Sequence, residues 1–348
     1  MATSRRPTIT AVAKHAGVSP MTVSRVLDGR STVSPELAER VRISVAALGY
    51  QRNEQARSLR PGQRSGLVGV AITNVANPYY AQFLLGAEEV LAETGRTLMI
   101  GSTADSVGRE ERLVAEFIGR QVEGLLVVPT GGRTHLLPRR LNGVPVVLAS
   151  RQVPGIGADT VVVADVQGAY VGTSALLERG HRMIGFLGSG MSSFTGGRRL
   201  EGFRLAHEDA GVAVREDLLR HGGSSLADDP EHHRVIAESL LHEHPDLTAV
   251  LCANNRNTVG LVRALARRGE LGRSAAELTV LAFDDFELAD VVDVALLVVD
   301  HDGRELGRCA ARMLTERLDG GFDGPARLIE LPTSLHLPTR GASDPGRD

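Results

Sequence analysis

Six side chains near the N-terminus have the chemistry needed to read a DNA sequence: Ser19, Pro20, Met21, Thr22, Ser24 and Arg25. An arginine can donate two hydrogen bonds to the O6 and N7 atoms of guanine, so Arg25 is the best candidate for base recognition. Pro20 and Met21 could make apolar contact, for example with a thymine methyl group. The hydroxyls of Thr22 and Ser24 are better suited to phosphate.

The spacing of apolar residues across positions 8–27 predicts two short helices joined by a tight turn. Thr8 can cap the start of the first helix, and Gly17 can end it. Ser19 can cap the second helix, and Pro20 suits its first position because that N–H needs no acceptor within the helix. Such a pair is typical of a helix-turn-helix, whose second helix enters the DNA major groove; a purely structural helix pair is the alternative.

A third helix is expected between Ser34, which can cap its start, and Gly49, which can stop it. Charge supports contact with nucleic acid. Residues 1–64 contain eleven Lys and Arg and four Asp and Glu, a formal net charge of +7, whereas the whole chain carries −3. A basic N-terminal part on an acidic body is typical of a protein that binds DNA.

The segments AGVSPMTVSRVLDG and NEQARSLR resemble the lactose/galactose repressor (LacI/GalR) family, and the resemblance continues to about residue 340. In that family the segment after the third helix is a hinge helix, which orders only when two subunits lie side by side on DNA. The resemblance implies that Asn53 caps this helix and that Arg60 reaches phosphate or the minor-groove edge. It also implies that Leu59 enters the minor groove and kinks a base step, with packing on its own domain as the alternative. The other DNA contacts that we expect are Arg30, Arg57 and Ser58.

The rest of the chain alternates apolar runs with helix-like stretches. The expected strands are Leu67–Ile72, Thr97–Gly101, Gly124–Val128, Val146–Ala149, Thr160–Val163, Met183–Gly188, Ala249–Ala253, Leu278–Phe283 and Leu296–Val299. The expected helices include Tyr79–Thr94, Val107–Arg120, Val166–Arg179, Gly196–Ala210, Arg256–Arg268 and Arg304–Asp319. This alternation predicts an α/β body with parallel sheets covered by helices, and a body of about 280 residues is expected to divide in two.

The family resemblance implies that this body consists of two lobes of the type I periplasmic-binding-protein kind, with a ligand cleft between them. We therefore expect an all-α helix-turn-helix head over 1–50, a hinge helix and linker over 51–64, a ligand-binding and dimerisation domain over 65–340, and a disordered tail over 341–348. The N-lobe would comprise about 65–165 and 300–325, and the C-lobe about 166–299 and 326–340. The chain would then cross between the lobes three times, near residues 165, 300 and 325.

Candidate ligand contacts lie where strands end, because parallel α/β sheets bind ligands beyond the carboxyl ends of their strands. Tyr79 and Tyr80 follow the first strand at a helix start, where an exposed ring could stack on a sugar or a base. By resemblance Tyr80 is the stacking residue, with core packing as the alternative. Arg199 matches the family's ligand-gripping arginine, whose donors suit vicinal hydroxyls or a carboxylate. The resemblance adds four polar contacts: Ser193, Thr195, Asn254 and Asp284.

Several positions depart from the family pattern, among them three at the candidate ligand site. Ser150 stands where an aspartate often ends a strand of the lobe, and Asn255 replaces the aspartate that usually follows Asn254. His301 occupies the place of a glutamine and could donate to a ligand, although a structural role is the alternative; its reference pKa of about 6.5 would make it sensitive to pH. The whole polar set fits a sugar or sugar acid, with a nucleobase or nucleoside as the second interpretation.

These observations predict a sequence-specific transcriptional regulator, expected to be a repressor. It would bind a pseudo-palindromic operator as a homodimer, and a small effector would control its affinity for that operator. An enzyme is not expected: the chain has no Gly-Lys pair for a Walker loop, and Gly185–Gly190 matches a dinucleotide loop poorly. Neither a cofactor nor a metal is expected, because His232–His233 and His242–His244 are interpreted as solvated helix residues.

Composition and the N-terminal sequence indicate the cellular compartment. Cys252 and Cys309 are too few for a disulfide framework, and no apolar run approaches the ~18 residues of a membrane span. The N-terminus lacks the apolar core of a signal peptide, so a cytoplasmic protein is expected. A solute-binding protein for transport would share the body, but it would need an export signal and would not carry the basic head.

Overall fold

The computed structural model describes residues 7–27, 33–51, 64–189, 193–222, 230–272, 277–286 and 289–337. The chain divides into two compact units, residues 1–65 and 66–348. The expected hinge helix, with Asn53, Arg57, Ser58, Leu59 and Arg60, lies outside the described residues, as do Arg30 and the tail 341–348. Within the described part of the chain, no helix has both the length and the hydropathy to cross a bilayer.

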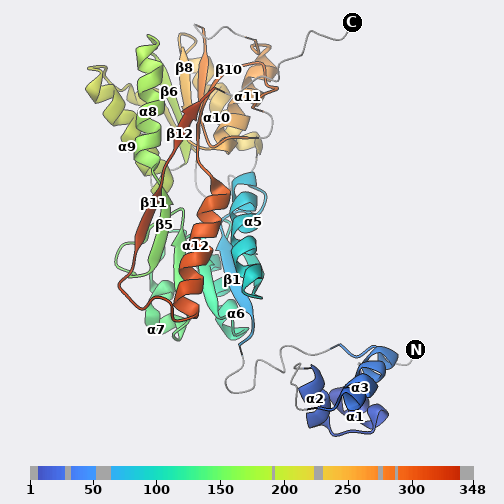
Figure 1. The fold of residues 1–348 in the computed structure, drawn as a ribbon. Helices are drawn as coiled ribbons and strands as arrows, with labels where there is room; N and C mark the ends of the chain where they lie inside the picture. Colours follow the sequence, from blue (N-terminus) through green and yellow to red (C-terminus); the bar gives the residue numbers. More distant parts are fainter. Residues whose placement is uncertain are drawn as a thin grey trace, which may run out of the picture. The chain divides into compact units, whose positions relative to one another are not determined.

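The first unit contains three helices, α1 (Ile9–Ala16), α2 (Pro20–Leu27) and α3 (Pro35–Leu48) (Figure 1). Their starts are capped as the sequence predicts. Thr8 Oγ1 accepts a hydrogen bond from the Ala11 amide at 3.3 Å, and Ser19 Oγ accepts one from the Thr22 amide at 3.1 Å. Gly17 adopts a left-handed φ of 65°, which permits the sharp turn into α2. The three helices enclose a small core around the fully buried Val12, Val23 and Val41.

The second unit consists of two α/β lobes, each built on a six-stranded sheet. The first sheet has the order β11-β5-β4-β3-β1-β2, and the second has the order β12-β10-β9-β8-β6-β7. The strands of the first sheet are β1 (Leu67–Ile72), β2 (Thr97–Ser102), β3 (Gly124–Val127), β4 (Val146–Ala149), β5 (Asp159–Val163) and β11 (Leu328–Leu331). Those of the second are β6 (Ile184–Ser189), β7 (Leu219–Gly222), β8 (Ala249–Cys252), β9 (Thr279–Phe283), β10 (Ala295–Asp300) and β12 (Ser334–His336). The described strand pairs are parallel except for β10 with β12.

Helices cover both faces of each sheet (Figure 1). In the first lobe these are α5 (Pro78–Glu93), α6 (Val107–Gly119), α7 (Pro138–Leu141) and α12 (Gly303–Leu318), with a 3-10 turn at Thr134–Leu136. In the second they are α8 (Asp165–Glu178), α9 (Phe194–Asp209), α10 (Pro230–Glu243) and α11 (Asn255–Arg268), with a 3-10 turn at Glu216–Leu218. The core of each lobe therefore lies in two layers, one on each face of its sheet.

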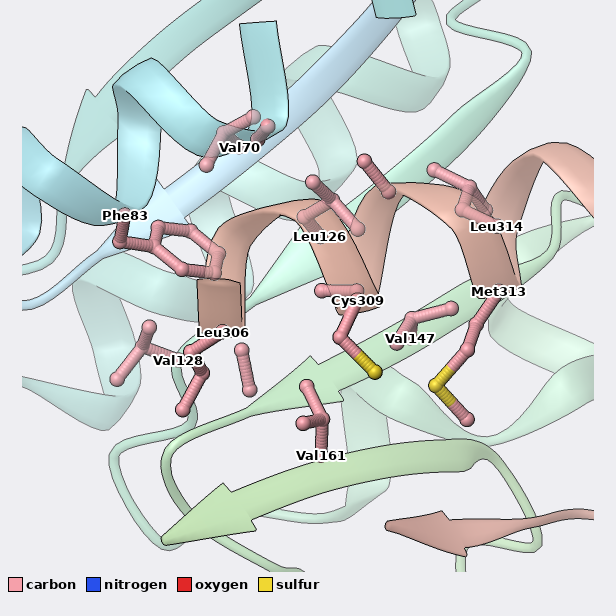
Figure 2. Packing of buried hydrophobic residues seen from close by; sticks show 14 of the residues in the cluster. Val70, Phe83, Leu126, Val128, Val147, Val161, Leu306, Cys309, Met313 and Leu314 are labelled. Atoms are coloured by element: carbon pink, nitrogen blue, oxygen red, sulfur yellow. The ribbon is translucent and has the colours of Figure 1, made fainter. Parts of the chain in front are cut away.

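The pair α5 and α12 covers one face of the first sheet. Figure 2 shows Phe83 of α5 and Leu306 and Met313 of α12 packed over Val70 and Val147 of the strands. The two helices approach closely at two glycines. A Cβ atom on Gly86 would lie 1.9 Å from the Arg304 carbonyl oxygen, and one on Gly307 would lie 2.0 Å from that of Phe83. Glycine at these positions lets α12, which follows the C-lobe in sequence, return to the first lobe.

The expected strands and helices agree with the structure to within about two residues, but three strands were missed. β7, β11 and β12 are short, and β11 alternates between exposed and half-buried residues, so none of them forms a long apolar run. The expectation that the third crossing lies near 325 was wrong. Leu328 of β11 pairs with Thr160 in the first sheet, and the chain crosses after β11, at residues 332–333.

Candidate functional site

A cavity of about 910 Å³ lies between the two lobes. It is lined by the start of α5, the connection from β10 into α12, the segment after β9 and the end of β12: Pro78, Tyr79, Gln82, Asp284, Asp285, Phe286, Ala289, Asp290, Asp300, His301, Asp302, Gly303, Arg304, His336 and Leu337. Three of the predicted ligand residues, Tyr79, Asp284 and His301, are in this lining. This volume is within the range of about 300–1,000 Å³ that is usual for small-molecule sites.

Asp284 follows β9 directly and is held in an unusual backbone conformation. Its φ is +73°, in the left-handed region that aspartate tolerates better than most residues. The residue is only 7% exposed, and its Oδ1 atom makes no hydrogen bond to any described residue. Arg199 Nη2 lies 3.6 Å from this oxygen, and His301 Nδ1 lies 3.5 Å from it. A buried acceptor held in this way is available to a ligand donor.

Arg199 of α9, a predicted ligand residue, is not in the cavity lining, but it lies beside Asp284, which is. Its Nε donates to Asp165 Oδ1 at 2.7 Å, and its Nη1 donates to the Ala253 carbonyl at 2.6 Å. The guanidinium also lies 3.6 Å from the centroid of the Phe283 ring. Burial lowers the pKa of Arg199, but the charges of Asp165 and Asp284 outweigh it and raise that pKa. Burial raises the pKa of Asp165, and Arg199 opposes that shift.

His301 follows β10 directly, in the connection from the second lobe into α12 of the first. It is 8% exposed, and neither ring nitrogen forms a hydrogen bond with a described residue. Burial lowers its pKa, so the imidazole is neutral at physiological pH, with one donor and one acceptor nitrogen. The ring lies 5.1 Å from the ring of Tyr79, measured between centroids. His301 and Asp284 therefore bring three unsatisfied polar atoms to one place in the lining.

The two tyrosines have separate roles. Tyr79 lines the cavity, and its hydroxyl lies 2.7 Å from Ser150 Oγ, at the end of β4; burial raises the pKa of Tyr79. Tyr80 is instead 6% exposed and belongs to the first-lobe core. The expectation that Tyr80 stacks on a ligand is not supported, because its position places it on the same helix face as Phe83 and Ala87, against the sheet.

The remaining predicted ligand residues lie at helix starts outside this lining. Ser193 caps α9, accepting a hydrogen bond from the Gly196 amide, and its hydroxyl lies 3.3 Å from that of Thr195. Asn254 caps α11, with Oδ1 accepting from the Asn257 amide at 2.9 Å. Asp300 also lines the cavity and was not among the predicted ligand residues, although its position at the end of an expected strand was a usable signal. Among the described residues, no group of His, Cys, Asp or Glu is arranged to hold a metal ion.

In the first unit, α2 exposes most of the residues predicted to read DNA. Met21 is 65% exposed, and Arg25 is exposed, with its Nη2 3.6 Å from Met21 Sδ. Thr22 is half-buried, and its hydroxyl lies 2.9 Å from that of Ser19. Ser24 is only 8% exposed, and its contact with phosphate stays a prediction. It lies three residues before Leu27, on the helix face that packs inward.

A three-helix unit with an exposed second helix, joined to a two-lobed body with an interlobe cavity, defines a class of protein. The first part has the architecture of a helix-turn-helix DNA reader, and the second that of a small-molecule sensor. Together they define a ligand-responsive DNA-binding regulator.

Comparison with known proteins assigns the family. Residues 8–53 match the model of bacterial regulatory proteins of the lacI family. Residues 65–332 match the model described as periplasmic binding proteins and sugar binding domain of the LacI family. The chain therefore belongs to the LacI family of bacterial transcriptional regulators, which are not enzymes.

Three known proteins illustrate the similarity. The HTH-type transcriptional regulator CelR of Thermobifida fusca is 31% identical over 97% of this chain and 99% of its own. A solved complex of a transcriptional regulator CelR with cellobiose has a TM-score of 0.70 at 29% identity, covering 97% of this chain and 100% of that one. The lac repressor dimer bound to operator and the anti-inducer ONPF has a TM-score of 0.80 at 24% identity, covering 97% and 99%. The last of these shows the shared fold.

Proposed function

We propose that this protein is a transcriptional repressor that binds a pseudo-palindromic operator as a homodimer and changes its operator affinity when a sugar or sugar derivative enters the interlobe cavity. The observation that carries the proposal is the cavity itself. It places Asp284, His301 and Tyr79 together from two lobes, in a chain that also has a helix-turn-helix unit.

The chemistry of the cavity supports a polyhydroxylated effector. Oδ1 of Asp284 forms no hydrogen bond to a described residue and can accept from a hydroxyl, and the neutral imidazole of His301 can accept from one hydroxyl and donate to another. The Tyr79 ring beside them offers an apolar surface for a sugar face. The family model describes a sugar binding domain, and a similar regulator has been solved with cellobiose.

The exposed face of α2 supports operator recognition. Arg25 and Met21 project from it, and they suit a guanine edge and a thymine methyl group respectively. Two copies of such a helix related by a twofold axis would read the two halves of a pseudo-palindrome, and the lac repressor structure is a dimer on its operator. Allosteric coupling between a ligand and the operator is usually ~1–3 kcal/mol, and it is reciprocal.

The test begins with selection of a binding duplex from a random pool, followed by anisotropy titrations of the wild-type protein with and without members of a sugar panel. A sugar that shifts operator affinity should also raise the melting temperature, because it binds the folded state. Asp284→Asn is the informative variant, since asparagine keeps the left-handed backbone accessible. It should bind the operator normally and lose the sugar response.

The matched control is Asp246→Asn, which removes an exposed carboxylate away from the cavity lining. It should keep both operator binding and the sugar response. Absence of any duplex preference over competitor DNA would overturn the DNA-binding half of the proposal. An Asp284→Asn protein with an unchanged sugar response would remove this cavity from the mechanism.

A further inference from the structure

The lining of the interlobe cavity carries an excess of negative charge. Five of its residues are aspartates: Asp284, Asp285, Asp290, Asp300 and Asp302. The positive or titratable basic residues in the same lining are Arg304, His301 and His336. Even with both histidines protonated, the carboxylates outnumber the cations among the described lining residues, so this part of the lining is negative in every protonation state of its histidines.

Arg304, the one arginine among the described lining residues, pairs with a carboxylate outside the lining. Arg304 Nε donates to Glu89 Oε1 at 2.7 Å, and Nη2 of the same guanidinium also contacts that carboxylate. Glu89 is not part of the cavity lining, and the same carboxylate is also bound by Arg308 at 2.7 Å. The charge of Arg304 is thus balanced from outside the cavity and does little to offset the aspartates.

The aspartates of the lining differ in whether their carboxylate oxygens already accept hydrogen bonds. Asp302 Oδ1 accepts from the Glu305 amide at 2.8 Å, and Asp285 Oδ1 accepts from the Phe286 amide at 2.8 Å. Backbone donors satisfy these oxygens but leave the negative charges in place. Asp284 Oδ1 has no hydrogen-bond partner among the described residues, although the side chain is nine-tenths buried. Asp284 therefore brings to the lining a carboxylate oxygen that has no hydrogen bond and can accept one from a ligand.

Resting on the proposed function, we infer that this cavity selects its effector by charge: it takes neutral or amine-bearing polyhydroxylated compounds and excludes sugar acids and sugar phosphates. A cavity walled by one sign of charge concentrates the opposite charge and repels its own. An anionic group would also lose its hydration without gaining a cationic partner, because Arg199 is already held by Asp165 and Arg304 by Glu89. The acid form of a sugar, which the residue types alone allowed, is thereby excluded.

Matched ligand sets test this inference. Several common hexoses and pentoses, each with its amino, uronic-acid and phosphate forms where these exist, are titrated against the full chain by calorimetry and thermal shift. For any sugar that binds in neutral form, the acid and phosphate forms should bind about tenfold more weakly or worse. The amino form should bind at least as tightly as the neutral one. An acid or phosphate that binds as tightly as its neutral parent would overturn the inference.

Varying the salt concentration distinguishes exclusion of anionic ligands by charge from exclusion by shape. Exclusion by charge should weaken as ionic strength rises, whereas exclusion of a bulky phosphate by shape should not change. The Asp290→Asn/Asp300→Asn double variant should also narrow the gap between neutral and anionic ligands, while the Asp246→Asn control keeps the wild-type gap. A gap insensitive to both salt and the double variant would overturn the inference.

If no member of the panel binds, the inference falls together with the ligand-regulated half of the proposed function. Retained binding to the selected duplex would then leave the DNA-binding half intact. If only the inference about charge is wrong, the result is different: an acid or phosphate form of a sugar binds as tightly as its neutral parent.

Discussion

The side-chain amide of Asn255 donates a hydrogen bond to Oδ1 of Asn77 at 2.9 Å, and this bond joins the two lobes. Asn77 caps α5 in the first lobe, and Asn255 begins α11 in the second. The same Oδ1 atom accepts from the Tyr79 amide at 3.1 Å, and Tyr79 lines the cavity. A change in the angle between the lobes would therefore alter the hydrogen bonds of Asn77 next to the ligand site.

Replacing Asn255 with aspartate, the residue that the family resemblance leads us to expect here, should destabilise this chain. A carboxylate at position 255 has no N–H to donate to Asn77 Oδ1. The Asn77 amide group could rotate to offer its NH₂ to that carboxylate, but Asn77 would then stop capping α5, because its nitrogen cannot accept a hydrogen bond from the Tyr79 amide. Since residue 255 is only 5% exposed, we expect a loss of about 1–3 kcal/mol in the free energy of unfolding by urea. Asn255→Ala should cost less, and an Asn255→Asp protein as stable as wild type would contradict the importance of this bond.

Arg199→Ala should destabilise the body much more than Arg198→Ala. Arg199 is 6% exposed, and its removal leaves the fully buried Asp165 without its cationic partner. Breaking such a buried pair costs about 3–5 kcal/mol. Arg198 instead pairs with Glu330 at a solvent-accessible site, where an ion pair contributes about 0–1 kcal/mol. Urea unfolding of the two variants measures the difference, and equal losses would mean that the Arg199 network does not stabilise the fold.

His301 should make the protein less stable as the pH falls. Its pKa is lowered in the folded state, whereas the unfolded chain has an ordinary value of about 6.5. Below that pH the unfolded state takes up a proton that the folded state refuses, so the stabilising contribution is present above about 6.5 and is lost on acidification. Burial lowers the pKa of His301 and outweighs the negative charges of Asp284, Asp165 and Asp300, which raise it. The positive charge of Arg199 also lowers this pKa.

The measurement is the free energy of unfolding at about pH 8 and about pH 5.5 for wild type and His301→Gln, which cannot titrate. The wild-type protein should lose more stability over this interval than the variant. His242→Gln, at an exposed position of α10, should follow the wild type. Parallel pH profiles for wild type and His301→Gln would show that this imidazole does not contribute.

Arg25→Ala should weaken binding to the selected operator by about 1–3 kcal/mol and leave non-specific binding nearly unchanged. The reason is that a bidentate contact to guanine discriminates between sequences, whereas a phosphate contact does not. Arg42→Ala on α3 is the control, since Arg42 is exposed and pairs with Glu39 within its own helix. Anisotropy titrations with the operator and with random duplex give both affinities. An equal loss on the two duplexes would assign Arg25 to phosphate.

The sequence alone determined the local features of this protein. The caps at Thr8 and Ser19 were predictable because a side-chain oxygen and the amides it satisfies are separated by only a few residues. The strands β1 and β4 were predictable because a buried parallel strand is a continuous apolar run. The helix-turn-helix and the two-lobed body follow from such signals together with the family resemblance.

Only the tertiary structure decided which side chains meet. Tyr79 and Tyr80 are adjacent and chemically identical, yet the packing of α5 on its sheet sends one to the cavity and the other to the core. Asp300 and His336 reach the same cavity from separate segments because β10 and β12 pair side by side. Local propensities carry no information about such long-range pairing, so neither the negative charge of the cavity nor the third crossing between the lobes could be read from the chain.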